Sequence, residues 1–474
     1  MDDHSKMKWL APAARMTRFD GQRRILILSW LTYTLAYTLR VNIAVVIPAL
    51  ISERGYTLTE MGLVTSLYFI TYMLGQLVNG YLGDRIGSKQ LIVVGLIGSA
   101  LCNLGVAFAP GLALTALCWA VNGMAQSMLW APIMKTLSTW FARYQLERVS
   151  FIMSMSMIVG YAVSWGVSSV LVTSLQWQLA FYLPAGLVAI FVLVLLYFFQ
   201  GVPAPEMPDD ATVGLESAAG TGAMNSARVA SPNAAGAGAA NSAPASTNAV
   251  GAAVSVSTVV GKQPEDLSIR EFFRLIQLPG LLVIALLQGL IREGISVWFP
   301  TILQDSGTLA ATTPVLILII IPLVNFGGIL LVRRINKHVK GDSIRTLLIV
   351  FFMTAGAALL LNIFLTELFW LVVPSMVVLL ALTYGLTPVF TSVIPFQYAQ
   401  YQRVALTAGV LDFAIYSGAA LSGLASGAIA DYFSWNGVML LWLVAAVLGL
   451  ILTTHRYIKN KGGQRHEQTI NNQT

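Results

Sequence analysis

Long apolar runs are the feature that most restricts what this chain can fold into. Runs of about 20 apolar residues recur along most of its 474 residues, and a helix of that length spans a lipid bilayer. The chain is 56% hydrophobic and only 10% charged, whereas about a quarter of the residues of a soluble domain are charged. We therefore expect an all-α integral membrane protein that crosses the bilayer many times.

The apolar runs form two sets of six, separated by a polar stretch. The composition of residues 203–262, rich in Ala, Gly, Ser, Asn and Pro, cannot bury a core and predicts a disordered linker. We expect an N-terminal tail (1–24), a six-helix bundle (25–200), a linker (201–268), a second bundle (269–455) and a C-terminal tail (456–474). The expected spans lie near 25–50, 59–82, 90–109, 112–138, 149–173 and 178–200, then near 279–303, 311–333, 344–364, 368–393, 404–427 and 435–455.

Basic residues predict the orientation of the spans. Cytoplasmic loops carry an excess of Lys and Arg, and the connections that we place on the opposite side hold one such residue, Arg54. This bias predicts that both termini are cytoplasmic. We expect the membrane to be a bacterial inner (plasma) membrane. The connections and the tail that we place inside hold Arg85, Lys89, Arg143, Arg148, Arg333, Arg334, Lys337, Lys340, Arg345, Arg403, Arg456, Lys459, Lys461 and Arg465.

Two arginines lie deep in apolar segments, one in each half. Arg40 and Arg292 are each followed by Ile three residues later, Val five later and Pro eight later, which indicates an internal repeat. A charge at the bilayer centre costs about 3 kcal/mol on insertion scales, and arginine cannot lose its proton to avoid that cost. Guanidinium groups bind phosphate or carboxylate with two parallel hydrogen bonds. The pair therefore predicts a central site for a small anion.

Other polar groups inside the spans indicate either a cavity or contacts between helices. Glu293 and Asp412 are acidic and are candidates for proton coupling or charge pairing, for example in an ion pair between Arg292 and Asp412. Polar residues recur at helical spacing on seven spans, which favours a shared water-filled cavity, although each stripe alone could bond a neighbouring helix. The stripes include Tyr68, Tyr72, Gln76 and Asn79; Asn122, Gln126 and Trp130; Ser150, Ser154, Met157 and Tyr161; Gln288, Arg292 and Ser296; and Thr383, Thr387 and Thr391.

The sequence gives no indication of an enzyme, a metal site or a cofactor. Its two cysteines lie in apolar segments, and its four histidines lie in tails, a loop or a helix end. No nucleophile and base pair stands out, and no Gly-rich Lys-Ser/Thr loop for nucleotide phosphates is present. We expect a monomer in the lipid bilayer whose partners are a small anionic substrate and a coupling ion, with no nucleic acid.

The segment from Gly80 to Lys89 resembles the motif between the second and third helices of the major facilitator superfamily. This resemblance implies twelve helices in two pseudo-symmetric bundles, with Asp84 and Arg85 at a cytoplasmic gate. The chain is further similar to the organophosphate antiporters of that superfamily. The similar segments surround Arg40, run from Gln126 to Pro132 and from Trp177 to Pro184, and run from Arg292 to Thr301.

The resemblance to the organophosphate antiporters implies roles for individual residues. Arg40 and Arg292 match the phosphate-binding arginines of that family. Gln76 stands where glycerol-phosphate members carry a lysine, and a serine near Ser156 stands where they carry a histidine. With Glu293 and Asp412, these changes make the site less cationic, which favours a monoanionic or larger substrate, or proton coupling. The matching cavity tyrosines are Tyr33, Tyr37, Tyr72 and Tyr416.

Three functions are compatible with these features. The first is a secondary transporter that moves a small organic anion, an organophosphate above all, by alternating access and exchanges it for inorganic phosphate. The second is a proton-coupled symporter of a sugar acid or other carboxylate, in which Asp412 or Glu293 carries the proton. The third is a transporter-like membrane sensor that binds a ligand and signals to a partner protein.

Overall fold

The computed structural model describes residues 18–141, 143–199, 268–305, 312–364, 369–398, 401 and 403–471. Every regular element in these ranges is a helix. Most of the linker expected at 201–268 lies outside the described residues, as does most of the N-terminal tail. The side chains of the gate residues Asp84 and Arg85 also lie outside the description, although their backbone is helical.

The N-terminal lobe contains six membrane crossings. Two of them, the first and the fourth, are each built from two helices with a short break between them. The helices of this lobe are α1 (Arg18–Thr38), α2 (Asn42–Arg54), α3 (Leu58–Arg85), α4 (Ser88–Phe108), α5 (Leu112–Gln126), α6 (Trp130–Trp140), α7 (Arg143–Ser174) and α8 (Leu179–Phe198).

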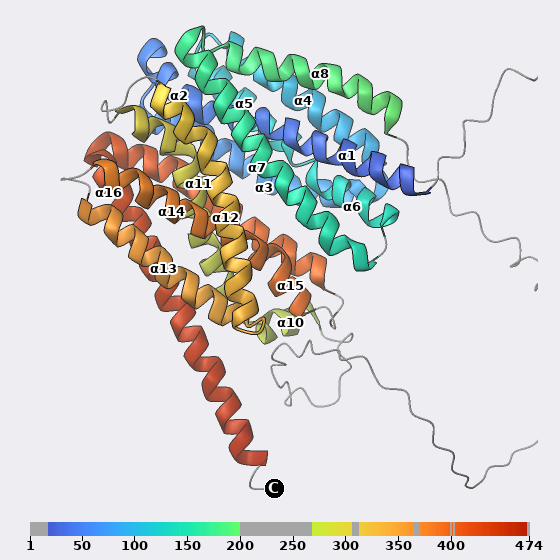
Figure 1. The fold of residues 1–474 in the computed structure, drawn as a ribbon, viewed down its shortest axis with the longest axis vertical. Coiled ribbons are helices and arrows are strands. Elements are labelled where there is room, and N and C mark those ends of the chain that lie inside the picture. The colour runs from blue at the N-terminus through green and yellow to red at the C-terminus, as the bar shows by residue number, and fades with distance from the viewer. Residues whose placement is uncertain are drawn as a thin grey trace, which may run out of the picture. The chain divides into compact units, whose positions relative to one another are not determined.

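The C-terminal lobe is colored from yellow-green to red in Figure 1. Its last two crossings form one continuous helix, α16, in which the backbone at Ser434 is non-helical (φ 60°) and divides the two expected spans. This helix also continues past residue 455, where we expected a tail to begin. The other elements are α10 (Ile269–Leu275), α11 (Leu278–Asp305), α12 (Thr312–His338), α13 (Ser343–Phe364), α14 (Phe369–Pro388), η2 (Val389–Val393) and α15 (Ile394–Gln397), and α16 is Val404–Asn471.

The lengths and compositions of these helices confirm the all-α membrane fold. Eleven helices in the described residues are long and apolar enough to cross a bilayer, and α16 alone contains two of the expected crossings. The short helix α10 begins with a capping box, in which the Ser268 hydroxyl and the Glu271 side chain bond each other's backbone N–H groups. This helix leads directly into α11.

The most extensive contacts between described helices of the two lobes are those of α2 with α11, α3 with α16, and α7 with α12. On the side of the bundle away from the described chain ends, α3 and α16 approach closely because glycines face each other. A Cβ atom on Gly62 would lie 2.4 Å from the carbonyl oxygen of Gly423, so a larger residue would push the helices apart. Nearby, the Asp431 carboxylate of α16 accepts hydrogen bonds from the backbone N–H groups of Leu58 (3.2 Å) and Thr59 (2.7 Å).

Candidate functional site

Arg40 lies at a break in the first membrane crossing. The chain leaves α1 after Thr38 and enters α2 at Asn42, and the residues between them form a turn. There the N–H groups of Leu39 and Arg40 donate to carbonyls three residues earlier, at 3.1 Å each. Such a break leaves carbonyl groups without their usual helical partners, and inside a membrane other groups must satisfy them.

Polar side chains from three neighbouring helices satisfy these carbonyls. Asn103 of α4 and Asn122 of α5 both donate to the Leu39 carbonyl, at 3.0 and 2.9 Å. Gln126 of α5 donates to the Ala36 carbonyl at 3.0 Å, and the Trp165 indole of α7 donates to the Val41 carbonyl at 3.2 Å. The amides of Asn122 and Gln126, which we expected to line a cavity, therefore hold the broken helix in place.

The guanidinium of Arg40 is buried among tyrosines. It donates a hydrogen bond to the Tyr416 hydroxyl at 3.3 Å. Its carbon atom lies 4.7 Å from the ring centroid of Tyr72, and the rings of Tyr37, Tyr68 and Tyr416 lie 5.3, 5.6 and 5.4 Å away. No carboxylate among the described residues forms an ion pair with it. Its positive charge is thus surrounded by aromatic faces and one hydroxyl, without an opposite charge.

Arg292 lies within the continuous helix α11 and has a carboxylate partner. Its Nη2 atom lies 2.6 Å from Oε1 of the adjacent Glu293, and its Nη1 donates to the Thr387 hydroxyl at 2.7 Å. Both members of the ion pair are almost fully buried. The alternative ion pair that we considered, between Arg292 and Asp412, is not formed among the described residues.

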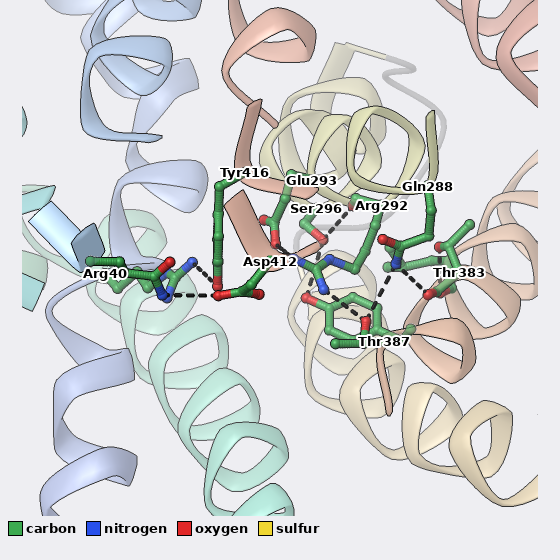
Figure 2. Close-up of polar contacts among 12 residues, drawn as sticks. Arg40, Gln288, Arg292, Glu293, Ser296, Thr383, Thr387, Asp412 and Tyr416 are labelled. Carbon is green, nitrogen blue, oxygen red and sulfur yellow. Dashed lines mark hydrogen bonds and ion pairs between the residues drawn. The ribbon is translucent and has the colours of Figure 1, made fainter. Parts of the chain in front are cut away.

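Tyr416 of α16 connects the two arginines across the lobes. Its ring centroid lies 5.4 Å from the guanidinium carbon of Arg40 and 5.9 Å from that of Arg292. Figure 2 shows Tyr416 and Asp412 between the two guanidinium groups in this view. One charge from each lobe therefore faces a common aromatic residue at the lobe interface.

Asp412 is linked to the N-terminal lobe by a neutral partner. Its Oδ2 accepts a hydrogen bond from the Gln76 amide of α3 at 3.0 Å, and its side chain is partly exposed. Asp412 precedes Tyr416 by four residues, so both lie on the same face of α16. The carboxylate is one helical turn closer than Tyr416 to the side on which α1 begins.

A small cavity of about 30 Å³ adjoins Arg40 and Glu293. Arg40, Tyr68 and Tyr161 of the N-terminal lobe and Glu293 and Ser296 of the C-terminal lobe contribute to its wall. A space of this size holds on the order of two water molecules. The two lobes are therefore closed tightly around this part of the site.

The remaining residues predicted for the site lie at different distances from the arginines. Tyr37 and Tyr72 face Arg40 directly. Tyr33 lies one turn away and packs against Trp130, with ring centroids 4.7 Å apart. Ser156 is fully buried, and its hydroxyl donates to the Met153 carbonyl of its own helix at 2.5 Å. No hydrogen bond between Ser156 and either arginine is formed among the described residues.

Four residues of the arginine environment were not among the predicted site residues. Tyr68, Tyr161 and Thr387 belonged to polar stripes that we noted, but Tyr384 was not identified. Its ring lies 5.4 Å from the Arg292 guanidinium carbon, and its hydroxyl lies 3.4 Å from the Ser296 hydroxyl. Tyr384 precedes Thr387 by three residues, so the helical spacing of the tenth span contained the signal.

The family of this chain follows from its similarity to known proteins. A family model described as Major Facilitator Superfamily matches residues 29–422. The chain belongs to the major facilitator superfamily. A solved structure described as a bacterial homolog to the human lysosomal transporter Spinster, in an inward-facing and unoccupied conformation, has a TM-score of 0.65 and 14% identity. It covers 93% of this chain and 97% of its own, and it supports the fold.

Curated relatives include proteins named as organophosphate transporters. A probable hexose phosphate transport protein of Chlamydia trachomatis is 24% identical over 180 residues, which are 38% of this chain and 40% of the relative. A phosphoglycerate transporter protein of Salmonella typhimurium is 29% identical over 201 residues, 41% of this chain and 43% of the relative. The membrane sensor protein UhpC of the same organism is 30% identical over 122 residues, 26% of this chain and 28% of the relative.

The chain spans less than half the length of the curated relatives it matches. Family and fold are those of transporters rather than enzymes. The protein is thus an integral membrane member of the major facilitator superfamily that resembles its organophosphate transporters.

Proposed function

We propose that this protein is a secondary transporter that carries a small organic anion, with organophosphates as the leading class, by alternating access. Arg40 and Arg292 bind the anionic group, and Tyr37, Tyr72 and Tyr416 form the surrounding wall. The stretch 201–268 links the two lobes, both termini are cytoplasmic, and the protein works as a monomer in a bacterial inner membrane. Inorganic phosphate is the exchanged ion.

The environment of Arg40 is the observation that carries this proposal. Removing an ion from water costs several kcal/mol, and an opposite charge must offset that cost. The partners of Arg40 among the described residues are tyrosines. An arriving anion supplies the missing charge, and two N–H groups of the planar guanidinium can bind it together.

The position of the site at the lobe interface supports alternating access. Arg40 of the N-terminal lobe bonds Tyr416 of the C-terminal lobe, and Gln76 bonds Asp412 across the same interface. An anion bound by both arginines interacts with both lobes, so it stabilises the arrangements in which they are close together. Superfamily transporters consist of two such halves with a site near the bilayer midplane.

Proteoliposomes loaded with inorganic phosphate test this function. We expect labelled glycerol-3-phosphate or a hexose phosphate to enter in exchange for phosphate without a pH gradient. The Arg40→Lys variant should lose most of this exchange at normal expression, because a point charge cannot reproduce the guanidinium fork. Arg345→Lys is the matched control. Arg345 is half-exposed and pairs with Asp342, and both residues lie far from Arg40 and Arg292 in the sequence and outside their contacts. Full exchange by Arg40→Lys contradicts the proposed role of Arg40.

Proton-coupled symport of a carboxylate is the second candidate. Asp412 favours it, because its hydrogen-bond partner among the described residues is a neutral amide and no ion pair fixes its charge. Uptake that collapses with a protonophore and persists without internal phosphate would support symport over exchange. A sensor is the third candidate, and one relative carries that name. Ligand binding without flux in the same proteoliposomes would support it.

A further inference from the structure

We propose that the substrate carries a positive amine in addition to its anionic group, so that it is a dipolar molecule such as an aminoalkyl phosphate or phosphonate. Arg40 and Arg292 bind the anionic end, and Asp412 binds the ammonium. This inference rests on the proposed transport function and specifies the chemical class of its substrate.

The formal charge of the site is the first argument. Two arginines and two carboxylates, Glu293 and Asp412, lie in this part of the lobe interface, so their charges sum to zero. Glu293 already neutralises Arg292 at 2.6 Å. A simple dianion would add negative charge beside two carboxylates in a region of low dielectric, where like charges repel strongly. A dipolar substrate offsets this repulsion with its own cation.

The direction of the charges is the second argument. Arg40 has no carboxylate partner and Asp412 has no cationic partner among the described residues. Both charges lie beside α16: Asp412 belongs to this helix, and Arg40, from the break between α1 and α2, bonds Tyr416, which lies four residues after Asp412 on the same face. Four residues of helix rise about 6 Å. A chain of two or three carbons between an anionic group and an ammonium spans such a separation.

The surroundings of Asp412 suit an ammonium. Gln76 fixes its Oδ2, and Oδ1 has no hydrogen-bond partner among the described residues, so it is available to a donor. Gln76 is also the position at which the resemblance to glycerol-phosphate transporters implies a lysine. In this chain the substrate supplies that positive charge.

A matched pair of probes tests the inference with purified protein at neutral pH. 2-Aminoethyl phosphate and n-propyl phosphate differ in that an ammonium replaces a terminal methyl group. We expect 2-aminoethyl phosphate to bind at least about tenfold more tightly in a thermal-shift titration, and a tenfold ratio corresponds to about 1.4 kcal/mol. Asp412→Asn should abolish this ratio. Asp342→Asn is the matched control, because Asp342 lies outside the site and an asparagine oxygen can still accept from the backbone of Ile344 and Arg345.

A second variant keeps the test informative if Asp412→Asn does not fold. Gln76→Lys places a cation beside Asp412 and should invert the preference, so that n-propyl phosphate binds more tightly than 2-aminoethyl phosphate. Equal binding of both probes by the native protein, with a ratio that neither variant changes, overturns the dipolar substrate. Phosphate exchange in proteoliposomes would then still support the transporter. If that exchange is also absent, the transport proposal itself fails.

Discussion

Arg40 and Arg292 occupy equivalent positions in an internal repeat, yet their environments differ. Arg40 lies in a broken helix whose carbonyls are bonded by Asn103, Asn122 and Gln126, and its charge faces tyrosines. Arg292 lies in an unbroken helix and pairs with the residue that follows it. In the N-terminal lobe, polar side chains thus bond the backbone carbonyls and leave the charge of Arg40 without an opposite charge. In the C-terminal lobe, Glu293 neutralises the charge of Arg292 directly.

Because of this difference, the two repeated arginines need not contribute equally to anion binding. Before an anion binds, the charge of Arg292 is already offset by Glu293, whereas that of Arg40 is not. Arg40 should therefore dominate the attraction of an anion, and Arg292 should contribute mainly through hydrogen bonds. Three experiments with four substitutions test this asymmetry, in order of decreasing expected effect.

Removing each arginine in turn should have opposite effects on stability. Arg292→Gln leaves the buried Glu293 carboxylate unpaired, which typically costs about 3–5 kcal/mol. Arg40→Gln removes an unmatched charge, so its Tm should equal or exceed that of the native protein, although anion exchange is lost. Thermal unfolding in detergent without ligand measures both. Equal losses of Tm in the two variants would contradict the asymmetry.

Tyr416→Phe removes the hydroxyl that accepts from Arg40 but keeps the ring between the arginines. A hydrogen bond to a charged group contributes about 1.5–3 kcal/mol, so we expect anion affinity to fall by about tenfold or more. Phosphate titration of the purified variant measures the change. Tyr457→Phe is a suitable control, because Tyr457 contacts Arg345 and Lys461 away from the site. An unchanged affinity would show that the hydrogen bond between Arg40 and the Tyr416 hydroxyl does not matter for anion binding.

Thr387→Val should have the smallest effect. It replaces a hydroxyl that accepts from Arg292 at 2.7 Å with a methyl group of similar size. Because Glu293 still holds the guanidinium, we expect a loss of affinity of about threefold, near the low end for one hydrogen bond. The same titration measures it. A loss as large as that of Arg40→Lys would mean that Thr387, rather than Glu293, positions Arg292.

The sequence was sufficient for the fold and for the two arginines, because both depend on local patterns. Apolar length predicts the crossings, and the matching Ile, Val and Pro spacing identifies the repeat. The contacts of those arginines depend on packing. Adjacent residues on a helix do not face each other in general, so Arg292 and Glu293 gave no local sign of an ion pair, and we considered Asp412 instead.

The break at Arg40 was equally hidden from sequence analysis. Its turn, from Leu39 to Val41, contains no Gly or Pro that would signal a helix end. The amides that bond its carbonyls come from positions more than 60 residues later, at Asn103, Asn122 and Gln126. Helical spacing correctly placed Asn122 and Gln126 on one face, but it could not distinguish a cavity wall from a support for the backbone.

The cap that Asp431 places on α3 bears on how readily the two lobes separate. The first turn of α3 also has a cap of its own, in which Thr57 and Glu60 bond each other's backbone groups. If the lobes part at this end, as the proposed alternating access requires, water can solvate the exposed N–H groups of Leu58 and Thr59, while Thr57 and Glu60 keep the helix from fraying. In that mechanism the Asp431 cap can be released without loss of helix α3.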